Sequence, residues 1–256
     1  MAVIQVVDVA KRFRDGDRET LALSRTDLTI HDNEIVCVVG PSGCGKTTLL
    51  NLLAGFLMPT EGSVLVDGAV VGGPDATRTV VFQADAVFPW LSVEDNIGYG
   101  LRLRGVDSQL RRARVRHYAS LVGLEDFMTA YPKQLSGGMR KRVDLARAYA
   151  SGPAVLLLDE PFGALDIFTR EAMWLALQQV NLAEPKTIVF VTHDIEEALF
   201  VGNRVIVMTP RPARVHAEIE VPFGAARDLD LRGDPEFQRL RISISHVLRE
   251  VSHDVS

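Results

Sequence analysis

The eight residues from Gly40 to Thr47 read Gly-Pro-Ser-Gly-Cys-Gly-Lys-Thr and fit the phosphate-loop pattern G-x-x-x-x-G-K-[ST]. A triphosphate carries many anionic oxygens, and a backbone rich in glycine can curl closely enough to direct several N–H groups at them. We expect Lys46 to reach the β and γ phosphates as a point charge and the Thr47 hydroxyl to bind Mg²⁺. An ordinary glycine-rich turn is the alternative explanation.

The segments on either side of this loop favour the phosphate site. Residues Ile35 to Val39 form an apolar, β-branched run that predicts a buried strand, and Thr48 to Ala54 is a good helix former. A helix that begins directly after the loop adds unpaired N–H groups and a positive dipole end to an anion site. We therefore interpret the loop as a strand-to-helix connection that binds phosphate.

Two neighbouring carboxylates follow a second apolar run. Residues Ala154 to Leu158 lead directly into Asp159 and Glu160. The carboxyl ends of strands line the crevice where α/β sheets bind ligands. We expect one carboxylate to hold Mg²⁺, directly or through water, and its neighbour to accept a proton from an attacking water. A solvated pair at a strand end is the alternative, and the phosphate loop upstream argues against it.

A third apolar run, Thr187 to Thr192, ends at His193 and precedes a short predicted helix, Ile195 to Val201. Of the six histidines, this one alone ends a predicted core strand. By itself a histidine in such a place is more often structural than catalytic. Because the chain also carries a phosphate loop, we expect His193 to face the γ-phosphate.

Ser136 and two glycines precede a predicted helix from Arg140 to Ala150. They open a second helix N-terminus suited to anions, although a simple N-cap explains the same residues. Earlier in the chain, a short strand from Thr79 to Phe82 ends at Gln83, and a polar residue there commonly marks the edge of a site.

Two groups of aromatic residues have open explanations. Phe13 lies in a predicted antiparallel flap, where stacking on a purine and half-buried core packing explain it equally well. The run Phe88 to Leu91 lies outside any clear periodicity and precedes a helix start at Ser92. Core packing is the default explanation for the run, and an apolar groove for a partner helix is the alternative.

Composition limits the class of protein. The 256 residues are 47% hydrophobic and carry a net charge of -5, which argues against a general nucleic-acid-binding surface. We expect a soluble, cytoplasmic chain, because no apolar run is long enough to span a membrane and no signal sequence is evident. A predicted tail helix that starts at Asp234 has one apolar stripe, which must be buried on this chain or on a neighbour.

In this order, the motifs resemble the ATP-binding subunit of an ATP-binding cassette (ABC) transporter over most of the chain. The resemblance implies an α/β, P-loop NTPase fold with a RecA-like core, an antiparallel β subdomain and an α-helical subdomain at about residues 84–151. It implies an ABC ATPase domain over residues 1–226 and a helical tail over 227–256.

The resemblance also implies a role for each motif. Phe13 stacks on adenine, Gln83 senses Mg²⁺ and the membrane partner, Asp159 binds the metal, Glu160 is the general base and His193 is the switch histidine. Residues 164–166 become the D-loop and residues 135–139 the signature. The implied nucleotide contacts are Phe13, Gly40, Pro41, Ser42, Gly43, Cys44, Gly45, Lys46, Thr47, Thr48, Ser136, Gly137, Gly138 and Met139; the implied metal set is Thr47, Gln83 and Asp159; the implied catalytic set is Glu160, His193, Gln83 and Lys46.

In this family the signature of one subunit closes over the nucleotide held by another, so the resemblance implies a head-to-tail dimer with two ATP sites. It also implies integral membrane permease subunits, an indirect substrate-binding protein and a peripheral place on the cytoplasmic face of the inner membrane, without nucleic acid. Three positions depart from the commonest pattern: Met139 and Lys141 stand where Gln is usual, and Phe13 replaces Tyr.

A narrower resemblance points to importers of nitrate, aliphatic sulfonates and taurine. It rests on Val81-Phe82-Gln83, Phe88-Pro89-Trp90-Leu91, Asp95-Asn96-Ile97, Pro161-Phe162-Gly163-Ala164-Leu165-Asp166 and Met208-Thr209-Pro210-Arg211-Pro212. A soluble cassette ATPase acting on ribosomes or DNA is the alternative, and one cassette without a long heptad insertion in a net acidic chain argues against it. A GTPase is disfavoured because no Asn is followed by Lys.

Overall fold

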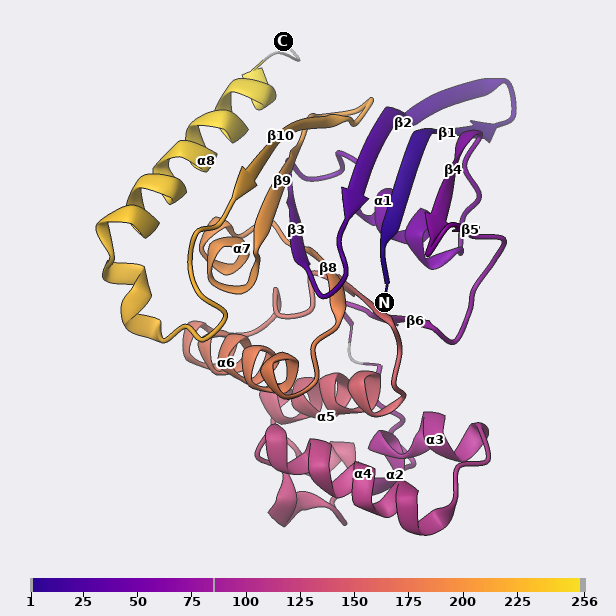
Figure 1. Cartoon of the computed structure of the whole chain (residues 1–256), viewed down its shortest axis with the longest axis vertical. Coiled ribbons are helices and arrows are strands. Elements are labelled where there is room, and N and C mark those ends of the chain that lie inside the picture. The colour runs from indigo at the N-terminus through magenta and orange to yellow at the C-terminus, as the bar shows by residue number, and fades with distance from the viewer. Residues whose placement is uncertain (1, 85, 254–256) are drawn as a thin grey trace.

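The computed structural model describes residues 2–84 and 86–253 and builds them around a central, mainly parallel sheet (Figure 1). Its strand order is β10-β9-β3-β8-β7-β6, and among the described residues of this sheet only the β9–β10 pair is antiparallel. The strands are β3 Ile35–Val39, β6 Arg78–Val81, β7 Val155–Asp159, β8 Thr187–Val191, β9 Arg204–Met208 and β10 Val215–Glu220.

Helices cover both faces of this sheet, which explains why its central strands are continuous apolar runs. Alternate residues of β3 belong to two different hydrophobic clusters, with Cys37 in one and Val36 in the other. The Val36 cluster includes Leu50 of α1 (Lys46–Ala54). The Cys37 cluster includes residues of α5 (Gly137–Ala150), α6 (Ile167–Ala183) and α7 (Ile195–Val201).

A second, antiparallel sheet has the order β2-β1-β4-β5. Its strands are β1 Ile4–Asp15, β2 Arg18–Ile30, β4 Glu61–Val66 and β5 Ala69–Val70. The buried face of this sheet packs in the same cluster as α1, with Ile4 and Leu28 among its members. The predicted antiparallel flap is confirmed, because β1 and β2 pair antiparallel.

The helical part lies beneath α5, at the end of the molecule away from β1 and β2 (Figure 1). It contains α2 Val93–Ile97, α3 Tyr99–Leu103, α4 Ser108–Leu121 and two 3-10 turns, Glu125–Phe127 and Pro132–Gln134. The predicted helix start at Ser92 is confirmed, because its hydroxyl accepts a hydrogen bond from the Asp95 N–H at 3.1 Å.

The chain continues into a 3-10 turn, Leu229–Gly233, and a long helix, α8 Pro235–His253. The apolar stripe of α8 is buried on this chain, since Phe237 and Ile244 have no exposed surface and α8 contacts α7 and β9. Within the described residues, no helix combines the length and the apolar character needed to cross a bilayer.

Candidate active site

The glycine-rich loop and the two carboxylates meet in one hollow of about 390 Å³ at the carboxyl ends of β3 and β7. The predicted Gln83 also lines this hollow. The full lining consists of Ser42, Gly43, Cys44, Gly45, Lys46, Thr47, Thr48, Gln83, Asp159, Glu160 and Arg211. The structure therefore brings together residues that are more than 100 positions apart in the sequence, at the edge where parallel sheets bind ligands.

The loop reaches α1 through a backbone conformation that favours glycine. Gly45, the N-cap of α1, has a φ of 127° and supplies no side-chain hydrogen bond to the first turn. A Cβ atom at Gly45 would lie 3.2 Å from the Cβ of Ala213 and 3.3 Å from the carbonyl oxygen of Ala22. The N–H groups at the start of α1 thus face the hollow without a competing capping side chain, as anion binding requires.

The amine of Lys46 lies against its own loop. Its Nζ donates to the carbonyl oxygens of Gly40 at 2.8 Å and Pro41 at 3.1 Å, and the residue is 6% exposed. Gly40 and Pro41 do not line the hollow themselves, but their carbonyls hold the Lys46 amine that does. The contacts hold one positive charge at the floor of a site that is open to solvent.

The pair formed by Thr47 and Asp159 offers oxygen ligands for a small cation. The Thr47 Oγ1 lies 3.1 Å and 3.3 Å from the two carboxylate oxygens of Asp159. Burial raises the pKa of Asp159, and the negative charge of Glu160 raises it further. Mg²⁺ usually binds one or two protein oxygens together with waters and substrate phosphates, so this donor set fits Mg²⁺.

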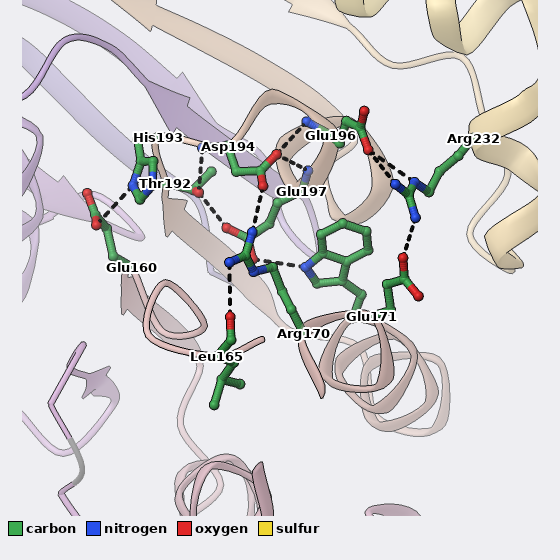
Figure 2. Close-up of polar contacts among 11 residues, drawn as sticks. Glu160, Leu165, Arg170, Glu171, Thr192, His193, Asp194, Glu196, Glu197 and Arg232 are labelled. Atoms are coloured by element: carbon green, nitrogen blue, oxygen red, sulfur yellow. Dashed lines mark hydrogen bonds and ion pairs between the residues drawn. The ribbon is translucent and has the colours of Figure 1, made fainter. Parts of the chain in front are cut away.

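Glu160 and His193 point toward one another (Figure 2). The His193 Nδ1 lies 3.1 Å from the Glu160 Oε2, and the Glu160 side chain is 24% exposed. Glu160 has a φ of 44°, a left-handed conformation that is rare for residues other than glycine and is often found at functional sites. Its N–H remains bonded to the Val191 carbonyl at 2.9 Å, so this unusual conformation is held by the neighbouring strand.

Buried polar groups fix the backbone behind His193 (Figure 2). Thr192 Oγ1 donates to the carboxylate of Glu197, and it accepts from the Asp194 N–H at 3.0 Å. The indole N–H of Trp174 also donates to Glu197, at 2.9 Å. Glu197 is 2% exposed, and burial raises its pKa.

An arginine on α6 joins two loops that flank the hollow. Arg170 Nη1 donates to Asp194 at 3.0 Å, and its Nη2 donates to the Leu165 carbonyl at 3.0 Å (Figure 2). Leu165 belongs to the predicted D-loop, and Asp194 follows the predicted switch histidine. Arg170 could not be predicted as part of the site from the sequence, because neither bond follows from local spacing.

The C-terminal segment contacts α6 and α7, the two helices that follow the D-loop segment and His193. Arg232 bridges Glu171 of α6 and Glu196 of α7 (Figure 2). Arg227 is 8% exposed, and its Nη1 donates to three carbonyls at the end of α7, those of Leu199, Phe200 and Gly202, each at 2.9 Å. The tail therefore stabilises the helix that follows His193.

Phe13 and the Ser136 motif do not line the hollow. Phe13 is 40% exposed, and the Lys11 amine lies 5.3 Å from its ring centre. Ser136 is the N-cap of α5, and its Oγ accepts from the Met139 N–H at 3.2 Å. Gly137 and Gly138 form the first turn of α5. Within one subunit, the structure thus leaves this second anion-suited helix N-terminus apart from the first.

Lys141 has a place that the sequence did not predict. It is 4% exposed, and its Nζ donates to the carbonyl oxygens of Gln83 at 2.6 Å and Phe82 at 3.3 Å. The lysine at this position therefore joins the helix of the Ser136 motif to the segment that carries Gln83.

The aromatic run beginning at Phe88 is a surface feature, so its default interpretation as core packing is wrong for Trp90. Trp90 is 70% exposed, and its ring centre lies 5.6 Å from that of Phe88. Phe88, Tyr99 and Leu103 line a largely apolar hollow of about 350 Å³ beside α5. Asn96 stabilises the turn, since its side chain accepts from the Phe88 N–H and donates to three carbonyls.

Comparisons with known proteins agree with this arrangement. Residues 23–163 match a family model described as ABC transporter. A putative ATP-binding protein of Brucella abortus is 48% identical over 89% of this chain and 88% of its own. The taurine import ATP-binding protein TauB of a Jannaschia species is 44% identical over 91% of this chain and 89% of its own.

Two solved structures share the fold. A bacterial ABC transporter cassette in dimeric form is 33% identical, with a TM-score of 0.72, over 86% of this chain and all of its own. A dimeric post-hydrolysis state of an ATP-binding cassette, bound to ADP and Pi, is 32% identical, with a TM-score of 0.71 and the same coverage. The predicted combination of a P-loop core, an antiparallel β part and a helical part is confirmed.

Proposed function

Because the chain belongs to the ABC transporter family, we propose that it is the ATP-hydrolysing subunit of an importer for a small anion such as nitrate, an aliphatic sulfonate or taurine. The observation that carries this proposal is the meeting of a cation-ligand pair, Thr47 and Asp159, with an acid–base pair, Glu160 and His193, around one phosphate loop. The names of the taurine-importing relatives support the choice of cargo.

Each side chain has a defined task in the proposed reaction. The loop from Gly40 to Thr48 and the Lys46 amine hold the β and γ phosphates. Glu160 accepts a proton from a water whose oxygen bonds to the γ-phosphorus, while the bond from that phosphorus to the bridging oxygen breaks and leaves ADP and phosphate. His193, 3.1 Å from Glu160, positions that carboxylate and the γ-phosphate.

A bound Mg²⁺ ion, held by Thr47 and Asp159 with Gln83 beside them, would neutralise charge on the β and γ oxygens. Phe13 would stack on the adenine ring of the nucleotide. Because Phe13 lies on the exposed flap, this contact depends on the base extending from the hollow toward β1.

The nucleotide site is completed by a second subunit in this proposal. Ser136, Gly137, Gly138 and Met139 of a partner would close over the triphosphate, which explains why a helix N-terminus suited to anions lies outside the hollow. The solved structures of related cassettes are dimeric, which supports a second ATPase subunit. We assign residues 1–226 to the cassette, with its helical part at about 84–151, and 227–256 to a tail, of which 254–256 lie outside the described residues.

The apolar hollow at Phe88 and the exposed Trp90 are the proposed docking surface for integral membrane permease subunits, which would place the chain peripherally on the cytoplasmic face of the inner membrane. A substrate-binding protein would act indirectly through the permease. Trp90→Glu should abolish co-purification with the permease and cargo-stimulated ATPase activity. The matched control is Ile242→Glu, which changes a residue of α8 that is 52% exposed. Unchanged behaviour of Trp90→Glu would show that the surface is wrongly assigned.

Transport in proteoliposomes tests the proposed function itself. With the permease and binding protein present, labelled nitrate, alkanesulfonate or taurine should enter only with ATP, and Lys46→Ala should stop entry. No ATP-driven entry of these anions would contradict the importer assignment. Sedimentation of the chain with ribosomes or DNA, instead of membranes, would favour the soluble cassette ATPase.

A further inference from the structure

Arg211 extends from the β9–β10 loop into the nucleotide hollow, although it lies far from the phosphate loop in sequence. The loop that carries Arg211 is firmly anchored. Ala213 exchanges backbone hydrogen bonds with β2, since its N–H donates to Ala22 at 3.0 Å and its carbonyl accepts from Ser24 at 2.8 Å. Ala213 is fully buried, and its Cβ approaches the position that a Cβ on Gly45 would occupy. The base of the Arg211 side chain is therefore fixed beside the phosphate loop.

The guanidinium of Arg211 holds one peptide group of that loop. Its Nη2 donates to the Gly43 carbonyl oxygen at 2.9 Å. The carbonyl of Gly43 and the N–H of Cys44 belong to one trans peptide, so they point in opposite directions. The Cys44 N–H accordingly points back across the loop, to the Pro41 carbonyl at 3.3 Å.

Packing does little to orient the Gly43 end of this peptide, whereas Cys44 at its other end is buried. Gly43 has a φ of 71°, and nothing lies within 4 Å of the position that a Cβ would occupy. Glycine can adopt many backbone conformations, so hydrogen bonds orient the Gly43 side of the peptide: the Cys44 N–H donates to the Pro41 carbonyl, and the Gly43 carbonyl accepts from Arg211. The hydrogen bond from Arg211 is thus a restraint from outside the phosphate loop, beside the internal bond from Cys44 to Pro41.

Charge gives Arg211 a second task. Among the described residues lining the hollow, Lys46 and Arg211 are the cations, and Asp159 and Glu160 are the anions. Lys46 alone leaves this lining net negative, which opposes the entry of a polyphosphate. A guanidinium is also well suited to phosphate, because its several N–H donors allow one to bind a carbonyl while others bind phosphate oxygens.

We propose that Arg211 is a nucleotide-binding residue that fixes the Gly43–Cys44 peptide and contacts the polyphosphate chain of ATP and ADP. The inference rests on the proposed ATP site and adds to it a residue from the far end of the cassette. It links nucleotide affinity to the β9–β10 loop.

Isothermal titration of the full chain with Mg-ATP and with ADP tests this assignment at low and high salt. The variants are Arg211→Gln, Arg211→Lys and the control Arg214→Gln, which removes the same charge from the same loop but outside the nucleotide hollow. We expect Arg211→Gln to raise the Kd for both nucleotides about tenfold at low salt, which corresponds to about 1.4 kcal/mol. The increase should shrink at high salt because the group is partly screened.

Arg211→Lys should bind more weakly than the wild type but more tightly than Arg211→Gln, since it retains the charge but loses the several donors of the guanidinium, and Arg214→Gln should bind like the wild type. The assignment of Arg211 fails if Arg211→Gln binds within twofold of the wild type, or if Arg214→Gln weakens binding equally. Lys46→Ala separates this result from the proposed function: loss of binding there with normal binding by Arg211→Gln refutes only the role of Arg211. Normal binding by Lys46→Ala refutes the nucleotide site, and the role of Arg211 with it.

Discussion

The ion pair between Arg170 and Asp194 should couple the D-loop segment to the residue after His193, and a double-mutant cycle can measure that coupling. The pair is 3.0 Å long, and its side chains are 25% and 29% exposed, so it is neither fully screened nor fully desolvated. Arg170→Ala removes this bond and the bond to the Leu165 carbonyl. Asp194→Asn removes the charge but keeps an oxygen that can accept from the Glu196 and Glu197 N–H groups at the start of α7.

These contacts set the expected loss of unfolding free energy in Arg170→Ala. A hydrogen bond to a charged group contributes about 1.5–3 kcal/mol when partly buried, but the α7 N–H groups still satisfy Asp194 after Arg170 is removed. We therefore expect Arg170→Ala to lower the free energy of unfolding by about 1.5 kcal/mol, and the melting temperature by about 3–6 °C. The coupling energy between the two positions should be about 1 kcal/mol.

Urea unfolding of the wild type, the two single variants and the double variant supplies the cycle. Strictly additive effects, with a coupling energy near zero, would show that the pair is only a surface contact of little energetic value. Arg170→Lys provides a matched control, because it keeps a charge but cannot reach Asp194 and Leu165 with two parallel N–H donors. Its stability should lie between those of the wild type and Arg170→Ala.

Two further changes test the packing around the site. Because burial raises the pKa of Glu197, the native state binds that proton more tightly than the unfolded chain, so wild-type stability falls as pH rises from the unfolded pKa through the folded one. Glu197→Gln removes this slope, and its melting temperature relative to the wild type should be higher at about pH 8 than at about pH 4; a constant difference would contradict the burial argument. In Gly138→Ala the new Cβ collides with Thr169 Cγ2, so overpacking of about 1–3 kcal/mol should outweigh the gain of up to about 1 kcal/mol in helix propensity. Urea unfolding should show a net loss that Thr169→Ser relieves, and a Gly138→Ala variant as stable as the wild type would refute the collision.

Local sequence patterns were sufficient for the elements that carry the phosphate chemistry. Five consecutive apolar residues make β3 a buried strand, and the glycine pattern after it has one well-defined structural meaning. The carboxylates after β7 and the histidine after β8 could be placed at one edge because parallel strands share the direction in which they end. These inferences needed only periodicity and the location of strand ends.

The contacts that the sequence did not predict depend on tertiary packing. Arg211 reaches Gly43 across 168 positions, and the pairing of β9 with β3 and of Ala213 with β2 brings their loops together. Nothing in the composition of the β9–β10 loop distinguishes Arg211 from its neighbour Arg214. Its place between two prolines was visible only as a subgroup marker.

The periodicity of an amphipathic helix also does not show which surface buries its apolar face. The stripe on α8 predicted burial but left open whether this chain or a neighbour supplies the cover. Buried Phe237 and Ile244 show that this chain does, and the buried guanidinium of Arg227 caps α7 just before the tail begins its own helix. The exposure of Trp90 also could not be predicted, because an aromatic run outside clear periodicity has core packing as its default explanation and a surface groove as the alternative.

Gel filtration of Glu160→Gln with ATP and Mg²⁺ is the most direct test of Glu160 as the general base of a site that a second subunit closes. Glutamine keeps the size of Glu160 but cannot accept the proton of the attacking water, so ATP should bind without turnover. We predict a dimer that forms with ATP, is absent with ADP, and is lost when Lys46→Ala is added to the same chain. A variant that stays monomeric with ATP, or that hydrolyses ATP at the wild-type rate, would contradict the claim that Glu160 drives hydrolysis at a site closed by a second subunit.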